Sequence, residues 1–266
     1  KMSEFDGLCV ALCRIMYRDT SVLLDSFEAL GYHVFHLSVE DVSDCGSTFV
    51  LLSQETDNGT EVIAVFRGTK TYSDIVTNLS FKPRRIESDG FPTLRMHGGI
   101  CDSAETTLRE ILPSLIDFHR RRPIRRLVLT GHSLGGGIAL ATMFHLLLQG
   151  ISDAYATVQT PQTIKAASQH IAAKYSQREV VQFLNACDMS TITFGSPLVF
   201  AGESCLNHPL VQAVHERSRC FVHAGDLVPR LLGRKAPGAW SAFLSRSDPA
   251  VTAVAQLAAG GAIAVG

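Results

Sequence analysis

The most constraining feature of the sequence is a predicted strand, a glycine-rich turn and a predicted helix in direct succession. The strand is expected at 125–130, and the helix at 135–148 is apolar on all sides, as in a helix buried against a sheet. The turn between them, Gly131-His132-Ser133-Leu134-Gly135, matches the pattern G-x-S-x-G. In this context the pattern predicts a sharp turn that presents the Ser133 hydroxyl at a helix N-terminus, where developing negative charge is favoured. A glycine-rich helix cap with an incidental serine is the alternative.

Strand-like and helix-like segments alternate along the chain, and no internal repeat or low-complexity linker divides it. This pattern predicts one α/β domain over residues 1–266, with a polar inserted segment at about 153–188 and an apolar tail at 251–266. Further strands are expected at 32–39, 48–53, 61–66, 190–194 and 219–223, and further helices at 20–30, 101–118 and 166–175. Asn58-Gly59 is expected to supply the positive φ angles of a hairpin turn.

Composition limits the class of protein. The 266 residues are 46% hydrophobic and carry 24 Lys plus Arg against 25 Asp plus Glu. A chain of this length can form a sizeable core, and its charge balance argues against nucleic-acid binding, which normally needs a basic excess. The seven cysteines contain no CxxC pair, so we expect mostly reduced, buried thiols and neither a disulfide framework nor a cysteine-rich zinc site. They are Cys9, Cys13, Cys45, Cys101, Cys187, Cys205 and Cys220.

Three features of the sequence bear on where the protein is located and whether it contacts a membrane. The chain begins at Lys1 without a recognisable secretory signal, which favours an intracellular or organellar location over secretion. The 16 residues at 251–266 are fewer than the roughly 20 needed to span a bilayer, so a packing helix with a Gly-rich tip is favoured over a membrane element. The five arginines within 120–126 predict a solvated connecting loop, with contact to anionic lipid headgroups as the alternative.

Four motifs between residues 60 and 231 occur in the order found in one enzyme family. They are Val65-Phe66-Arg67-Gly68-Thr69, then Met96-His97-Gly98-Gly99-Ile100, then the G-x-S-x-G turn, and finally Thr193-Phe194-Gly195-Ser196-Pro197 followed by Ala224-Gly225-Asp226-Leu227-Val228-Pro229-Arg230-Leu231. Together they resemble the class 3 lipase family, including its diacylglycerol-lipase-like and phospholipase-like members, although Ile100 replaces an aromatic residue. The resemblance implies an α/β-hydrolase fold with a mostly parallel central sheet flanked by helices.

The resemblance also implies catalytic roles. It makes Ser133 the nucleophile and Asp226 the carboxylate that orients a catalytic histidine. It makes Thr69 and Leu134 the donors of the oxyanion hole. The position of Asp226 after a predicted strand agrees with this role, because ligands of α/β sheets bind at the carboxyl ends of strands. An aspartate that merely caps its turn is the alternative.

Residues 70–81 occupy the position of the family's lid. Ile75, Val76 and Leu79 would form one apolar stripe if this segment were helical. Such a helix could cover the site in water and turn toward a membrane or other lipid interface. A fixed, packed helix is an equal alternative.

The catalytic histidine is not identified. The family places it after the acid, yet all ten histidines precede Asp226, and the last of them is His223. Either the base lies beyond Gly266 or it has been lost. Substitute bases are a weaker alternative, and the candidates are His97, His208, His215 and His223.

These features lead to competing hypotheses. The first is a serine carboxylic-ester hydrolase that acts on acylglycerols or related lipid esters through an acyl-enzyme, with no metal or cofactor required. The second, favoured by the missing base, is a catalytically silent lipase-fold subunit of a larger assembly. A lipid-binding module with an unused serine is the third.

Overall fold

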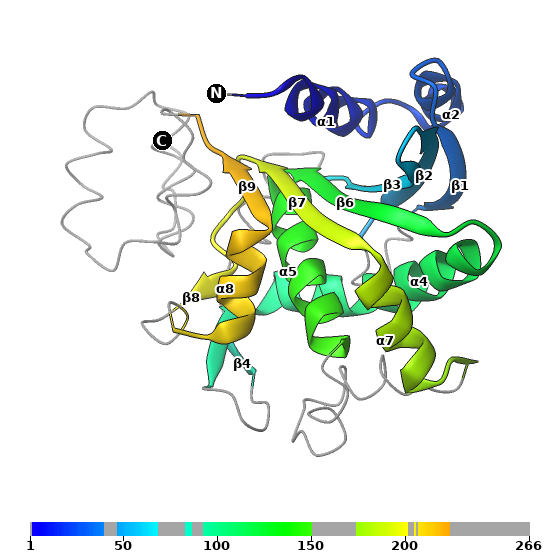
Figure 1. Ribbon diagram of the computed structural model, residues 1–266. Helices are drawn as coiled ribbons and strands as arrows, with labels where there is room; N and C mark the ends of the chain where they lie inside the picture. The colour runs from blue at the N-terminus through cyan, green and yellow to red at the C-terminus, as the bar shows by residue number, and fades with distance from the viewer. Residues whose placement is uncertain are drawn as a thin grey trace, which may run out of the picture.

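The computed structural model describes residues 2–39, 47–68, 83–86, 93–150, 174–201, 205 and 207–223. At its centre lies a six-stranded sheet in the order β1-β2-β3-β6-β7-β9 (Figure 1). The strands β1 to β3 pair antiparallel, whereas β3–β6, β6–β7 and β7–β9 pair parallel. The strands are β1 (His33–Ser38), β2 (Phe49–Thr56), β3 (Gly59–Phe66), β6 (Ile124–His132), β7 (Asp188–Phe194) and β9 (Ser218–Phe221).

Helices cover both faces of this sheet (Figure 1). One face carries α1 (Glu4–Ile15) and α2 (Thr20–Glu28), and the other carries α4 (Gly98–Arg121), α5 (Leu134–Gln149), α7 (Gln177–Ala186) and α8 (Pro209–Glu216). Alternate residues of one strand therefore enter two different cores. In β2, Phe49 and Leu51 pack in the core with α4 and α5, whereas Val50 and Leu52 pack in the core with α1 and α2. The predicted α/β class, with a mostly parallel sheet between helices, is confirmed.

A small second sheet leads the chain into α4. It consists of β4 (Pro83–Ile86), β5 (Leu94–His97) and β8 (Phe200–Ala201), all antiparallel. His97 ends β5, and its Nδ1 accepts a hydrogen bond from the Ile100 amide at the start of α4. The histidine of the family-like Met96–Ile100 motif is thus a helix cap.

The hairpin between β2 and β3 is present, but its turn differs from the prediction. Thr56 pairs with Gly59, so Asp57 and Asn58 form the loop. Gly59 has a φ of 106°, whereas Asn58 does not have a positive φ. A Cβ at Gly59 would also meet the Arg125 side chain. The prediction was therefore wrong for Asn58, because the left-handed position falls on the residue that begins β3.

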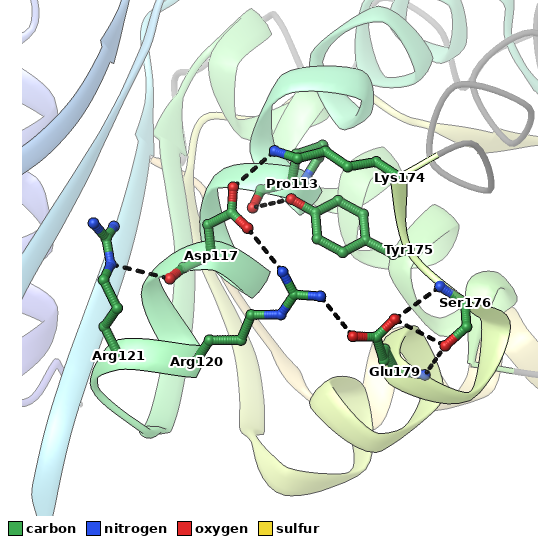
Figure 2. A network of polar contacts seen from close by, with 8 residues as sticks. All are labelled: Pro113, Asp117, Arg120, Arg121, Lys174, Tyr175, Ser176 and Glu179. Carbon is green, nitrogen blue, oxygen red and sulfur yellow. Dashed lines mark hydrogen bonds and ion pairs between the residues drawn. The ribbon is translucent and has the colours of Figure 1, made fainter.

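The arginines at 120–126 do not form the loop that we expected. Arg120 and Arg121 lie in the last turn of α4, and Arg125 and Arg126 already belong to β6. Arg120 contacts Asp117 and Glu179, and Lys174 also pairs with Asp117 at 2.8 Å (Figure 2). These ion pairs join the end of α4 to the start of α7. The connection is shorter than the predicted loop, because β6 begins directly after Pro123.

The segment expected as a polar insertion contributes to the core where it is described. Its residues 177–186 form α7, which buries Val180, Phe183 and Leu184. The remainder from 153 to 173, most of the helix expected at 166–175, and the tail at 251–266 lie outside the described residues. Among the described residues, no helix combines the length and the apolar character needed to cross a membrane.

Candidate active site

The predicted turn after β6 has the backbone geometry of a nucleophile elbow. Ser133 stands between β6 and α5 with φ 54° and ψ −128°, and it is the only non-glycine residue with positive φ in the described part of the chain. Such a conformation costs on the order of 1–3 kcal/mol. The surrounding backbone holds it, since the Ser133 amide donates to Phe194 O at 2.9 Å and the Gly136 amide donates to Ser133 O at 2.9 Å.

Glycines allow this turn because the chain passes very close to itself. A Cβ at Gly131 would lie 2.3 Å from the carbonyl carbon of Gly135, and one at Gly135 would lie 2.4 Å from Phe66 O. At Gly137, a Cβ would lie 2.9 Å from the Ile100 side chain. The glycines therefore let α5 approach the end of β3 and the start of α4 closely at this turn.

The Ser133 hydroxyl is enclosed and unpaired. Ser133 is 5% exposed, and its Oγ has no hydrogen-bond partner among the described residues. Leu134 begins α5, so its amide is one of the first in the helix and has no intrahelical acceptor. Gly68 lies against the same turn, because a Cβ there would be 2.5 Å from His132 O and 3.5 Å from the Ser133 Cβ. The end of β3 and the elbow are thus adjacent.

Several predicted site residues lie outside the described part of the chain. These are Thr69, Asp226 and the three residues of the lid stripe, Ile75, Val76 and Leu79. Their assigned roles remain predictions. Of the pair expected to form the oxyanion hole, the structure describes Leu134 alone.

The substitute bases that we considered occupy four different places in the fold. His97 caps α4, and burial lowers its pKa. His208 lies at the N-cap of α8 beside Phe144, and burial lowers its pKa as well. His215 is on the exposed side of α8, and His223 follows β9. None of the described histidines makes a hydrogen bond to Ser133 Oγ.

A tyrosine that follows α1 was not anticipated from the sequence and connects two parts of the site. Its hydroxyl, on Tyr17 just after α1, lies 3.1 Å from His132 Nδ1 and accepts a hydrogen bond from the Gly68 backbone. Burial raises the Tyr17 pKa to about 12, so the phenol stays protonated and can donate to the imidazole. Tyr17 therefore bridges the end of β3 to the elbow.

A cavity of about 480 Å³ opens beside the elbow. It lies between α1 and the carboxyl ends of β6 and β7, where α/β folds bind ligands. The described part of its walls is mainly apolar and includes the side chain of Arg14. The lining residues are Val10, Cys13, Arg14, Tyr17, His132 and Phe194. Sequence analysis missed it because four of them belong to α1 or follow it directly, and α1 was not predicted.

The chain is similar to known lipases in sequence and in structure. Residues 63–236 match the family model for lipase (class 3). Over 184 residues the chain is 25% identical to the chloroplastic phospholipase A1 PLIP1 of Arabidopsis thaliana. This aligned region covers 68% of this chain and 23% of that protein. Over 84 residues it is 29% identical to a lipase of Rhizomucor miehei, which covers 32% of this chain and 23% of that protein. The chain thus matches less than a quarter of the length of either relative.

Solved structures agree at the level of the fold. A triacylglycerol lipase described as having a serine protease triad at its catalytic centre superposes with a TM-score of 0.61 at 18% identity, covering 89% of this chain and 75% of that one. This likeness confirms the α/β-hydrolase fold. Because the family model covers more than half of the sequence, the chain belongs to the class 3 lipase family.

Proposed function

We propose that the chain carries the catalytic domain of a serine ester hydrolase that cleaves lipid esters through an acyl-enzyme on Ser133. The observation that carries this proposal is the strained backbone of Ser133, at φ 54°, between a parallel strand and a buried helix. Strain of this kind persists only where the surrounding structure holds it, and it is typical of catalytic turns. A serine that only capped the helix would not need positive φ.

The proposed reaction begins with attack of Ser133 Oγ on the acyl carbonyl of the ester. A general base takes the hydroxyl proton, and the carbonyl oxygen becomes an oxyanion. The Leu134 amide and Thr69 would donate hydrogen bonds to this oxyanion. Collapse then expels the alcohol, which takes up the proton, and water releases the fatty acid from Ser133 in a second step.

Asp226 is proposed to orient the imidazole that serves as this base. Asp226 comes five residues after the end of β9. Because β9 runs parallel to β7, its carboxyl end lies at the edge of the sheet where the elbow follows β6. The histidine itself is proposed to lie in a part of the protein beyond Gly266, because no histidine follows Asp226 in the 266 residues.

The proposed substrate class is a lipid ester, either an acylglycerol or a phospholipid. The apolar cavity lined by Val10 and Phe194 suits a hydrocarbon chain next to the elbow. The names of the two relatives, a phospholipase A1 and a lipase, support the same class. Contact with a lipid interface through Ile75, Val76 and Leu79 is part of this proposal.

A silent subunit is the second candidate function. One observation favours it, namely that Ser133 Oγ makes no hydrogen bond to a histidine among the described residues. Removal of the base would leave roughly 10³- to 10⁴-fold acceleration over water, which is far below a working hydrolase.

Labelling with a fluorophosphonate probe tests the proposal, because the probe reacts with an activated serine. We expect labelling of the wild-type protein extended beyond Gly266, which would include the proposed base, and complete loss of the label in Ser133→Ala of that protein. Ser53→Ala is the matched control, since Ser53 is also 5% exposed but lies on β2, where its hydroxyl donates to His33 O. Circular dichroism and thermal unfolding should show that all three proteins are folded.

Two results would contradict the assignment in different ways. A label that persists in Ser133→Ala would show that another residue reacts. A folded wild type that never labels, in a protein extended beyond Gly266 as well as in this chain, would favour the silent subunit.

A further inference from the structure

Three potential metal-binding side chains meet in the interior between α4 and α5. Cys101 and Glu105 lie one turn apart on α4, and His145 faces them from α5. Each is at most 1% exposed. Cys101 Sγ lies 3.5 Å from Glu105 Oε1 and 3.7 Å from His145 Nε2, and the histidine nitrogen lies 4.0 Å from the same carboxylate oxygen.

Arg84 of β4 holds the carboxylate in place. Its guanidinium donates to Glu105 Oε2 at 2.9 Å and also pairs with Asp102. The second carboxylate oxygen, Oε1, is therefore left to face the thiol and the imidazole. Polar groups behind a ligating carboxylate commonly fix its orientation in this way.

Burial affects the imidazole and the thiol in opposite ways, since it favours the metal-binding form of the imidazole and disfavours that of the thiol. It lowers the pKa of His145 to about 3, so the imidazole is neutral and no proton competes for its nitrogen. It also raises the pKa of the Cys101 thiol well above the ordinary value, so this sulfur carries a proton while no cation is bound. Binding of a metal ion would release this proton to solvent.

We propose that Cys101, Glu105 and His145 form a binding site for a divalent metal ion of the zinc class. Ideal tetrahedral zinc, with bonds of about 2.3 Å to sulfur and 2.0–2.2 Å to nitrogen and oxygen, separates its donor atoms by roughly 3.3–3.6 Å. The two separations that involve sulfur, 3.5 and 3.7 Å, are close to this range, whereas the 4.0 Å between nitrogen and oxygen requires a contraction of about 0.6 Å.

Charge balance supports the same site. The ion and the Arg84 guanidinium would bring three positive charges, and the Cys101 thiolate with the two carboxylates that Arg84 contacts would bring three negative charges. With Asp102, whose side chain is half-exposed, the filled site would be neutral overall, and such a balance lowers the cost of placing the other charges in the interior. The site would tie α4 to α5, the helix that begins at the elbow.

Cobalt binding provides the test, because thiolate ligation to Co²⁺ gives a charge-transfer absorption in the near ultraviolet. The protein is unfolded in urea with a chelator and refolded with Co²⁺ or Zn²⁺, since the buried site must be filled during folding. We expect the charge-transfer band, one ion retained per chain after gel filtration, and a raised midpoint of thermal unfolding.

Variants distinguish this site from surface binding. Cys101→Ala and His145→Gln should lose the band and the shift in unfolding midpoint. Arg84→Gln should bind about 10- to 100-fold more weakly. The control is Cys187→Ala, because Cys187 is also buried but donates to Ile124 O away from the cluster, and it should bind like the wild type. Absence of the band in the folded wild type, or equal binding by Cys101→Ala, would overturn the proposal whatever the result with the fluorophosphonate probe.

Discussion

At the scale of single residues, the elbow combines one residue of strained backbone with glycines whose lack of a side chain permits the close backbone contacts around it. Ser133 adopts positive φ although it has a side chain, while its neighbours Gly131 and Gly135 have none. A glycine at 133 would relieve the strain but would remove the hydroxyl. The conformational strain of positive φ therefore falls on the one residue of the turn whose side chain the proposed chemistry needs.

A pair of glycine-to-alanine variants tests how tightly the elbow is packed. Gly135→Ala should destabilise the protein by about 2 kcal/mol or more, because its Cβ would overlap Phe66 O, a backbone atom that cannot move aside. Gly7→Ala, in the interior of α1 with no atom within 4 Å of the new Cβ, should stabilise it by about 0.5–1 kcal/mol. Urea unfolding measures both. Equal effects of the same sign would contradict the packing described here.

The elbow itself could be predicted from the sequence, whereas its surroundings could not. The G-x-S-x-G pattern lies within five consecutive residues, and its apolar flanks specify a strand and a helix. Tyr17, by contrast, is 115 residues away from His132 in sequence, and nothing local marks the contact. Cys101, Glu105 and His145 were missed for the same reason, since their proximity depends on how two helices pack.

At the scale of elements, α1 secures the side of the site opposite α5. Its N-terminus has a capping box, in which Ser3 and Asp6 bond each other's backbone and side chains. Asp6 is fully buried and also holds Arg219 of β9 through two contacts of 2.9 and 3.1 Å. The helix that lines the cavity is thus joined to the strand that leads toward Asp226.

Asp6→Asn should weaken this connection. Burial raises the Asp6 pKa, but hydrogen bonds from Ser3 and the charge of Arg219 outweigh burial and place the pKa below 3.8. The carboxylate therefore contributes stability above pH 3.8, and that contribution is lost as the pH falls through the folded-state pKa. We expect the variant to be about 1–3 kcal/mol less stable at pH 7, the range for hydrogen bonds to charged groups.

The comparison with wild type should also depend on pH. The difference between the two proteins in urea unfolding should shrink as the pH falls from 3.8 through the folded-state pKa, because Asp6 of the unfolded wild-type chain binds a proton that the folded protein takes up only at lower pH. Asp25→Asn, on the exposed side of α2, is the control and should change little at either pH. A difference that stays constant with pH would show that the ion pair is not its source.

Strands and the central helices were predictable because their apolar runs are long or β-branched, as in β3 and β6. Several of the elements that escaped prediction are short. Examples are α8, with eight residues, and α7, with ten. Their few buried side chains become apparent only against the core that they cover. The antiparallel β4, β5 and β8 are shorter still, and long-range pairing rather than local preference defines them.

At the scale of the whole molecule, burial of neutral imidazoles sets how the fold responds to acid. Among the described residues are four histidines whose pKa burial lowers from 6.5, and for His145 the value falls to about 3. The four are His97, His119, His145 and His208. In the unfolded chain each binds a proton as the pH falls through 6.5, whereas in the folded protein it stays neutral to lower pH. Stability is therefore complete above pH 6.5 and is lost as the pH falls below it.

The interval from pH 6.5 to 4.5 isolates this effect, because carboxylates of the unfolded chain titrate at 4.5 and below. In metal-free protein, each fully buried histidine should reduce the free energy of unfolding by roughly 1.4 kcal/mol per pH unit in this range. His145→Gln should therefore lose about 2–3 kcal/mol less than the wild type between pH 6.5 and 4.5, as measured by urea unfolding with a chelator present. His215→Gln, at an exposed position of α8, should follow the wild-type curve. Parallel curves for the wild type and His145→Gln would mean that His145 takes up its proton within the folded protein, contrary to its enclosure between α4 and α5.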